Sequence, residues 1–182
     1  MISQIKNCRR CNLCFNQEPL LDKRQESQVF WVGLSAKKTL SDYEMPLSPN
    51  TNSGMVIKKI EEKIDGISTY KTNLVKCLPL NSQQKLRYPN KQEIDSCIIN
   101  LQDEIRDISP NIVFLLGEKV SSSVSKYLNI KFDKWNKFNY YYEKHEGSYY
   151  IPIHHPSYIY VYKRKLIEQY TTNIEQLIRR LL

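Results

Sequence analysis

The spacing of the cysteines constrains the fold of this chain more than any other feature. Cys8 and Cys11 form a C-x-x-C pair near the N-terminus, whereas Cys77 and Cys97 stand far along the chain. A C-x-x-C pair places two thiolates on one tight turn, which is the geometry that a soft metal ion or an iron–sulphur cluster requires. If Cys77 and Cys97 complete a four-cysteine site, the fold brings the N-terminus against the middle of the chain.

Short apolar runs alternate along the chain with segments whose apolar residues recur at helical spacing. We expect strands over 28–33, 70–77 and 111–117, and a hairpin over 138–153 that turns at Glu146-Gly147. We expect helices over 54–64, 91–108, 118–128 and 166–182. The segments 34–52 and 78–90 are expected to be long loops. This alternation predicts one domain, residues 1–182, folded as a three-layer α/β/α sandwich with a central, mostly parallel sheet. Ligands bind beyond the carboxyl ends of such strands, where Ser35, Asn73 and His155 stand.

The composition favours a polyanionic partner. The 182 residues carry a net charge of +8, and thirteen of them are tyrosines, which suit base stacking when they lie among lysines. An AT-rich genome would also raise both counts. No apolar run reaches the roughly 18 residues of a membrane span, so no membrane partner is expected. An odd number of cysteines without a secretory leader predicts a reducing, cytoplasmic location, and we expect a monomer.

Five motifs follow one another over almost the whole chain: CRRC, TNLVKCLP, PNKQEIDSC, PNIVFLLG and HHPSYI. Their order and spacing resemble the uracil-DNA glycosylase superfamily, in particular its iron–sulphur branches, families 4 and 5. The resemblance implies a structural [4Fe–4S] cluster held by Cys8, Cys11, Cys77 and Cys97. Spacing alone leaves a four-cysteine zinc site equally open. Cys14 is then an additional thiol, which is expected to be free near the cluster but could also substitute for one of the ligands.

The same resemblance assigns roles to two polar residues. Asn73 would recognise the base, because an amide can donate to one edge atom of a pyrimidine and accept from the next. His155 would donate toward the carbonyl O2 of the pyrimidine and stabilise the negative charge on the departing base. Without the resemblance, Asn73 would be interpreted as a backbone cap and His155 as an ordinary surface residue. His154 would be structural or would support His155.

The loop after the first strand departs from the family pattern. It begins Gly33-Leu34-Ser35-Ala36-Lys37 and lacks the acidic residue of family 4, while Leu34 is nearer to family 5. Ser35 falls where other branches position water, and Leu47 stands near the place of the aromatic that stacks on the flipped base. These changes alter the base pocket and leave its substrate open. Three further residues of this loop are candidates for the missing carboxylate or ring: Asp42, Tyr43 and Glu44.

The segment after the HPS motif, residues 158–165, reads YIYVYKRK. In the superfamily this segment enters the duplex and fills the gap left by the flipped nucleotide. An exposed basic helix is an equally good interpretation. The side chains expected to contact DNA here and in the loop before the last cysteine are Tyr158, Lys163, Arg164, Lys85 and Arg87.

These residues predict a monofunctional DNA glycosylase, which flips uracil or a modified pyrimidine out of DNA and hydrolyses its N-glycosidic bond. No lysine stands where a Schiff-base nucleophile is expected, so lyase activity is not predicted. The enzyme would serve DNA repair, or attack modified foreign DNA such as a phage genome. Two alternatives stay open: a catalytically silent iron–sulphur DNA-binding protein of the same fold, and a zinc-containing RNA-binding module.

Overall fold

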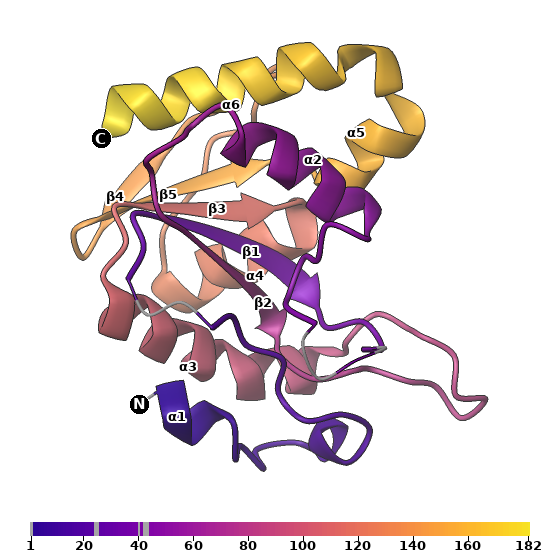
Figure 1. The fold of residues 1–182 in the computed structure, drawn as a ribbon. Coiled ribbons are helices and arrows are strands. Elements are labelled where there is room, and N and C mark those ends of the chain that lie inside the picture. Colours follow the sequence, from indigo (N-terminus) through magenta and orange to yellow (C-terminus); the bar gives the residue numbers. More distant parts are fainter. Residues whose placement is uncertain (1, 24–25, 40, 42–43) are drawn as a thin grey trace.

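The computed structural model describes residues 2–23, 26–39, 41 and 44–182 (Figure 1). Within these ranges the strands are β1 (Val29–Ser35), β2 (Thr69–Val75), β3 (Ile112–Leu116), β4 (Glu143–His145) and β5 (Ser148–Ile153). The helices are α1 (Ile2–Ile5), α2 (Asn52–Glu61), α3 (Lys91–Ile108), α4 (Glu118–Leu128), α5 (Pro156–Tyr162) and α6 (Ile167–Leu181), with short 3-10 turns η1 (Asn12–Phe15) and η2 (Arg164–Leu166). None of the helices in these ranges is long and apolar enough to cross a lipid bilayer.

The strands of the described chain form one sheet in the order β2-β1-β3-β5-β4. The first four run parallel, and β4 pairs antiparallel with β5 at the edge. Alternate side chains of each strand enter two cores: Trp31 lies under α2, α5 and α6, whereas Phe30 faces α3 and α4. The predicted three-layer α/β/α sandwich is therefore confirmed, and the carboxyl ends of the parallel strands meet at one edge.

The observed elements depart from the sequence prediction in a few places. Helix α3 has the predicted bounds, and the β4–β5 hairpin turns at Glu146-Gly147, where both residues have positive φ. The hairpin is shorter than predicted, because Phe138 and Tyr140 turn into the core against Tyr170 of α6 instead of extending β4. Ser35, predicted in a loop, is the last residue of β1. Helix α1 and the turn η1 were not predicted.

The N-terminal segment lies against the middle of the chain. Helix α1 packs beside α3, on the side of the molecule away from α6 (Figure 1). The backbone N–H of Leu20 donates to the carbonyl of Lys76 at 2.9 Å, and the side-chain amide of Asn16 donates to the carbonyl of Leu78 at 2.9 Å. These bonds hold the cysteine-bearing N-terminus next to the residues that follow β2.

Candidate active site and cysteine pocket

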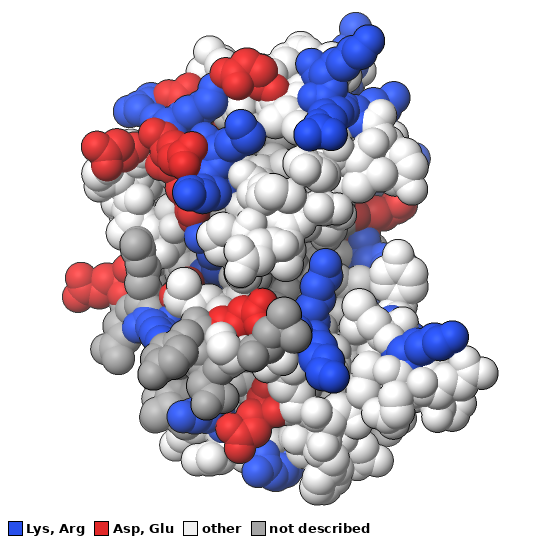
Figure 2. All heavy atoms as spheres, turned by 45° about the vertical axis from the view of Figure 1, so that its right-hand side comes forward, with Lys and Arg blue, Asp and Glu red and all other residues white. Residues whose placement is uncertain are grey.

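An open cleft of about 760 Å³ lies at the carboxyl ends of the parallel strands. Its floor is formed by Gly33 of β1, Asn73 of β2, Gly117 after β3 and His155 after β5. Figure 2 looks onto this side of the molecule, where basic and acidic side chains border a central hollow, and the residues that line the cleft include more cations than carboxylates. The topology thus brings together residues from four distant parts of the sequence.

Asn73 presents a side-chain amide to this cleft. It is paired in register with Gly33, and the residue is 3% exposed. A Cβ atom at Gly33 would lie 2.4 Å from Oδ1 of Asn73, so only glycine leaves room for the amide. Among the described residues, the Asn73 amide has no hydrogen-bond partner. Because Asn73 lines the cleft, the donor and acceptor of its amide are suited to a polar ligand there.

A fully buried ion pair lies behind Asn73. The ammonium group of Lys76 pairs with Glu104 of α3, and neither side chain is exposed. Nζ of Lys76 also donates to the backbone carbonyl of Asn73 at 2.6 Å and to the hydroxyl of Thr72 at 2.8 Å. Glu104 accepts a further bond from the hydroxyl of Tyr70 at 2.9 Å. This network fixes the backbone that presents the Asn73 amide.

The sequence analysis did not single out this pair. Its one local signal is a lysine that directly follows the apolar residues Leu74 and Val75 inside a predicted strand. Burial, reinforced by the neighbouring Glu104 carboxylate, raises the pKa of Tyr70 far above its ordinary value. Tyr70 therefore stays protonated and acts as a hydrogen-bond donor to Glu104.

His155 is the residue that caps the N-terminus of α5. Its Nδ1 atom accepts from the backbone N–H of Ser157 at 3.3 Å and lies 2.7 Å from the Ser157 hydroxyl. Since Nδ1 accepts, the neutral imidazole carries its proton on Nε2. Burial lowers the pKa of His155 below its ordinary value, and the charge of Lys37 lowers it further. The ring is therefore a neutral N–H donor at neutral pH.

Gly117 leaves the space that the His155 ring occupies. Its backbone has φ +89°, a conformation that side-chain-bearing residues rarely adopt. A Cβ atom at Gly117 would lie 3.2 Å from Cβ and 3.5 Å from Cδ2 of His155. The backbone N–H of Gly117 donates to the carbonyl of Ile153 at 2.8 Å, which holds the ends of β3 and β5 together.

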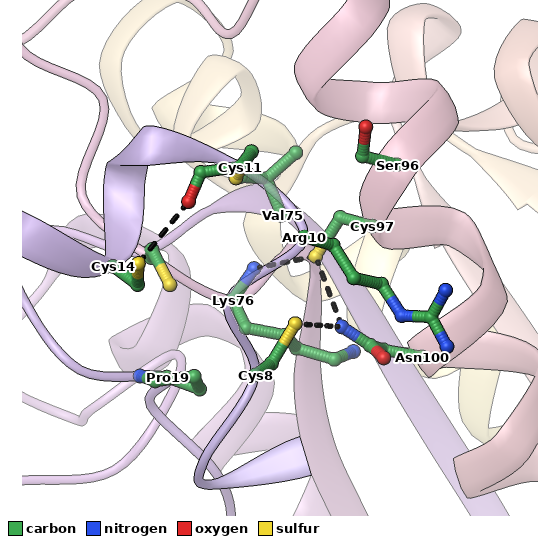
Figure 3. Close-up of a pocket in the computed structure, with 11 residues that line it drawn as sticks. Cys8, Arg10, Cys11, Cys14, Pro19, Val75, Lys76, Ser96, Cys97 and Asn100 are labelled. Atoms are coloured by element: carbon green, nitrogen blue, oxygen red, sulfur yellow. Dashed lines mark hydrogen bonds between the residues drawn. The ribbon is translucent and has the colours of Figure 1, made fainter.

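All five cysteines line a second pocket, together with Val75 and Lys76 at the end of β2. Figure 3 shows Cys8, Cys11, Cys14 and Cys97 around this pocket. Cys97 of α3 accepts hydrogen bonds at its sulphur from the backbone N–H of Lys76 at 3.4 Å and from the amide of Asn100 at 3.8 Å. The same Asn100 amide lies 3.4 Å from the sulphur of Cys8. N–H groups directed at cysteine sulphur are typical of thiolates that bind iron or zinc.

Burial, together with a smaller contribution from the neighbouring cysteines, raises the pKa of Cys77 to about 12. Burial also raises the pKa of Cys97. Among the described residues, no group of three or more His, Cys, Asp or Glu side chains is arranged to hold a metal ion. The structure brings Cys8, Cys11, Cys77 and Cys97 to one pocket. The identity of a metal or cluster bound by them is a matter for proposal.

The cysteine-bearing segment also supports the cleft. The side chain of Gln17, just after η1, donates to the carbonyl of Lys37 at 3.2 Å and accepts from the backbone N–H of Thr39 at 3.0 Å. Lys37 and Thr39 both line the cleft. The N-terminal segment thus holds one cleft wall through Gln17, in addition to contacting the strand that carries Asn73.

A family model described as "Uracil DNA glycosylase superfamily" matches residues 10–179 of this chain. The chain belongs to the uracil-DNA glycosylase superfamily. It is 31% identical over 139 residues to a protein of Saccharolobus solfataricus named "Type-4 uracil-DNA glycosylase". That alignment covers 74% of this chain and spans 62% of the relative's length. The resemblance inferred from the five motifs is confirmed.

The fold is also similar to a solved structure of the wild-type SMUG2 protein of Pedobacter heparinus. The two structures superpose with a TM-score of 0.56 at 14% sequence identity. The match covers 86% of this chain and 76% of that protein. It supports the shared architecture of the sheet and its covering helices.

The loop predicted to depart from the superfamily pattern forms a wall of the cleft between β1 and α2. Leu34, Ser35 and Leu47 all line the cleft. Leu47 has φ 52°, which is strained for a leucine, and it packs next to Gly33. A Cβ atom at Gly54 would lie 1.9 Å from the carbonyl oxygen of Ser48, so α2 begins directly against this wall. Of the three loop candidates, Glu44 lines the cleft, whereas Asp42 and Tyr43 fall outside the described residues.

The residues predicted to contact DNA divide into two groups. Tyr158 lines the cleft from α5, and Arg87 lines it from the opposite side, with its guanidinium bonded to both carboxylate oxygens of Glu93. Lys85, Lys163 and Arg164 are exposed and do not line the cleft. Residues 158–165 form the end of α5 and η2. The cationic side chains of the cleft that sequence reasoning missed are Lys37, Lys38 and Lys119.

His154 faces away from the cleft into an aromatic cluster. Its Nδ1 atom lies 2.9 Å from the hydroxyl of Tyr140, and its carbonyl accepts from the hydroxyl of Tyr170 at 2.8 Å. The ring of Trp135 lies 5.0 Å away. Burial lowers the pKa of His154. These contacts fix the chain immediately before His155, which agrees with a structural role.

Proposed function

We propose that this chain is a DNA glycosylase that removes uracil or a modified pyrimidine from DNA. The observation that carries the proposal is that an unpaired amide, Asn73, and a neutral N–H donor, His155, line one cleft bordered by cations. An enzyme that acts on a base must hold it outside the helical stack. The floor of the cleft offers an amide for its edge and a donor for its carbonyl.

The proposed reaction breaks the bond between N1 of the base and C1′ of the sugar, and the electron pair leaves with the base. The Nε2–H of His155 donates to the O2 atom on which the negative charge develops. Donors of this kind contribute roughly 10²–10³ in rate. Because His155 is already neutral, it stabilises the anion without a prior change in its own protonation.

Water is the proposed nucleophile at C1′, and the products are a free base and an abasic site. Ser35 and Glu44 line the cleft and offer oxygen atoms that can accept a hydrogen bond from this water. The base is read by the donor and acceptor of the Asn73 amide. We expect hydrolysis without β-elimination, so the DNA strand stays intact until it is treated with alkali.

We further propose that Cys8, Cys11, Cys77 and Cys97 hold a [4Fe–4S] cluster, with Cys14 as a spare thiol. The convergence of the cysteines, the N–H donors at their sulphurs and the similarity to a Type-4 relative support this ligand set. A bound cluster would cross-link the N-terminal segment, the end of β2 and α3. Its role is structural.

Anaerobically purified protein should be brown and contain iron and acid-labile sulphide in equal amounts. Cys97→Ser should lose both, and Cys14→Ser should retain both. A colourless protein that contains zinc would contradict the cluster and favour the zinc alternative.

A panel of oligonucleotides tests the glycosylase proposal. Each carries one uracil or one modified pyrimidine, as a single strand and as a duplex, and abasic sites are revealed by alkaline cleavage. We expect cleavage of at least one substrate after alkali. Tight DNA binding without product from any substrate would instead favour a silent DNA-binding protein. The base that is released will decide between DNA repair and attack on modified foreign DNA.

A further inference from the structure

A structured arm of the chain faces α5 across the cleft. In this arm, residues 80–88, Leu80 and Leu86 pair as an antiparallel bridge. The backbone N–H of Asn81 donates to the carbonyl of Lys85 at 2.9 Å, and the side chain of Asn81 accepts from the backbone N–H of Gln83 at 2.9 Å. Figure 1 shows this arm extending from the body of the molecule between β2 and α3.

The base of the 80–88 arm is fixed to α3. The guanidinium of Arg87 donates to the carbonyl of Leu80 at 2.9 Å and to both carboxylate oxygens of Glu93, at 2.8 and 2.6 Å. Glu93 also accepts from the backbone N–H of Asn90 in the capping box that begins α3. Arg87 therefore holds the arm in place, and its neighbour Tyr88 is presented on a preorganised support.

Aromatic side chains stand on both sides of the cleft. Tyr88 of the arm is 70% exposed, and Tyr162 on α5 is 72% exposed. Both line the cleft, together with Leu86, Tyr158 and Val161. The ammonium group of Lys119 lies over one face of the Tyr88 ring, 4.8 Å from its centre, so a ligand would stack on the opposite face. Exposed rings beside cations suit a ligand with flat apolar faces and a negatively charged backbone.

We propose that Tyr88 is a stacking surface for a base next to the target nucleotide, and that the DNA bound here is single-stranded. This inference rests on the proposed glycosylase function and specifies the form of its substrate. In a duplex, the neighbours of the target base stay stacked within the helix, whereas in a single strand they are free to stack on rings at both walls. Lys119, beside Tyr88, contacts the adjoining phosphate.

Equilibrium binding tests this inference without requiring excision. The probes are a fluorescent single strand with one stable abasic analogue and the same strand annealed to its complement. We expect the wild-type protein to bind the single strand more tightly than the duplex. Tyr88→Ala should weaken single-strand binding by about 5- to 150-fold, because stacking contributes roughly 1–3 kcal/mol per base.

Two variants serve as matched controls. Tyr88→Phe keeps the ring, and Tyr127→Ala removes a tyrosine that is 47% exposed on α4 and does not line the cleft. Both should bind the single strand within about twofold of the wild type.

Lys119→Ala tests the phosphate contact. It should reduce the slope of log K against log salt concentration by about 0.7, the value for one phosphate contact in a single strand.

The fluorescence of 2-aminopurine, placed next to the abasic analogue, tests the stacking directly. The wild-type protein and Tyr88→Phe should quench it, and Tyr88→Ala should not. The inference is overturned if Tyr88→Ala keeps wild-type affinity and quenching, or if the duplex binds more tightly than the single strand. If the expected binding and quenching are observed but no base is excised from any substrate, the role of the arm in binding DNA is supported and only the glycosylase proposal is contradicted.

Discussion

The floor of the cleft and the wall between β1 and α2 are built in different ways. The floor residues Asn73 and His155 belong to the carboxyl ends of the parallel strands β2 and β5, which are separated in the sheet by β1 and β3, and two glycines leave room for their side chains. The wall has irregular backbone, a strained Leu47 and a support that comes from Gln17. The difference indicates that the floor holds the proposed chemistry, while the wall adapts the pocket to a particular base.

The buried ion pair under the floor gives the largest expected effect. Lys76→Met leaves the Glu104 carboxylate buried without its cation, and removing one partner of such a pair costs about 3–5 kcal/mol of the free energy of unfolding. Urea unfolding measures this loss. The double variant Lys76→Met, Glu104→Leu should recover much of it, because both charges are removed. An unchanged midpoint for Lys76→Met would show that the pair does not support the floor.

Gly33→Ala should distort the floor itself. The added Cβ would lie 2.4 Å from Oδ1 of Asn73, so the amide must move away from its position. We expect kcat/KM for base excision to fall by roughly 10²-fold, the cost of misplacing a group in the site. Gly66→Ala is the control, since Gly66 has φ +83° and no neighbour within 4 Å. That variant should lose stability and keep its activity per folded molecule.

A change in the wall should alter selectivity more than rate. Leu47→Phe places a ring in the wall of the cleft, and a change in an apolar pocket is worth about 1–3 kcal/mol of discrimination. The ratio of kcat/KM values for uracil and a bulkier pyrimidine should therefore change by about tenfold. An equal decrease in kcat/KM for every base would contradict a role of Leu47 in selectivity and would indicate that it supports the reaction itself.

The pH dependence should be small for catalysis and visible for stability. Burial holds the pKa values of His154 and His155 below 6.5, so the unfolded chain binds more protons as the pH falls. The contribution of these two histidines to stability should be fully present above pH 6.5, decline as the pH falls below it, and stop declining below their folded pKa values. Single-turnover rates should likewise be level above pH 6.5. A rate that rises as His155 becomes protonated would contradict a neutral donor.

The order of strands and helices could be predicted from the sequence, because apolar runs and helical spacing are local signals. The bounds of α3 and the turn at Glu146-Gly147 were predicted correctly for this reason. The extra strand length expected over 138–142 was wrong, since Phe138 and Tyr140 alternate like a strand but are drawn into the core by α6.

The candidate site was predictable only where a motif carried it. Asn73 and His155 stand in recognisable sequences, and the fold brings both to the cleft. The contacts that support them join residues far apart in the chain, such as Lys76 with Glu104 and Gln17 with Lys37. No local pattern specifies such pairs, because each depends on the packing of two elements that the sequence describes separately.

The most direct test of the central claim compares single-turnover base release by the wild type, Asn73→Asp and His155→Asn on the best substrate of the panel. Asn73→Asp keeps the shape of the side chain and removes its donors, and His155→Asn keeps an acceptor for the α5 cap. We predict that each variant folds, binds DNA and releases base at least about 100-fold more slowly. Wild-type rates in both variants would contradict the assignment of this cleft as the site of base excision.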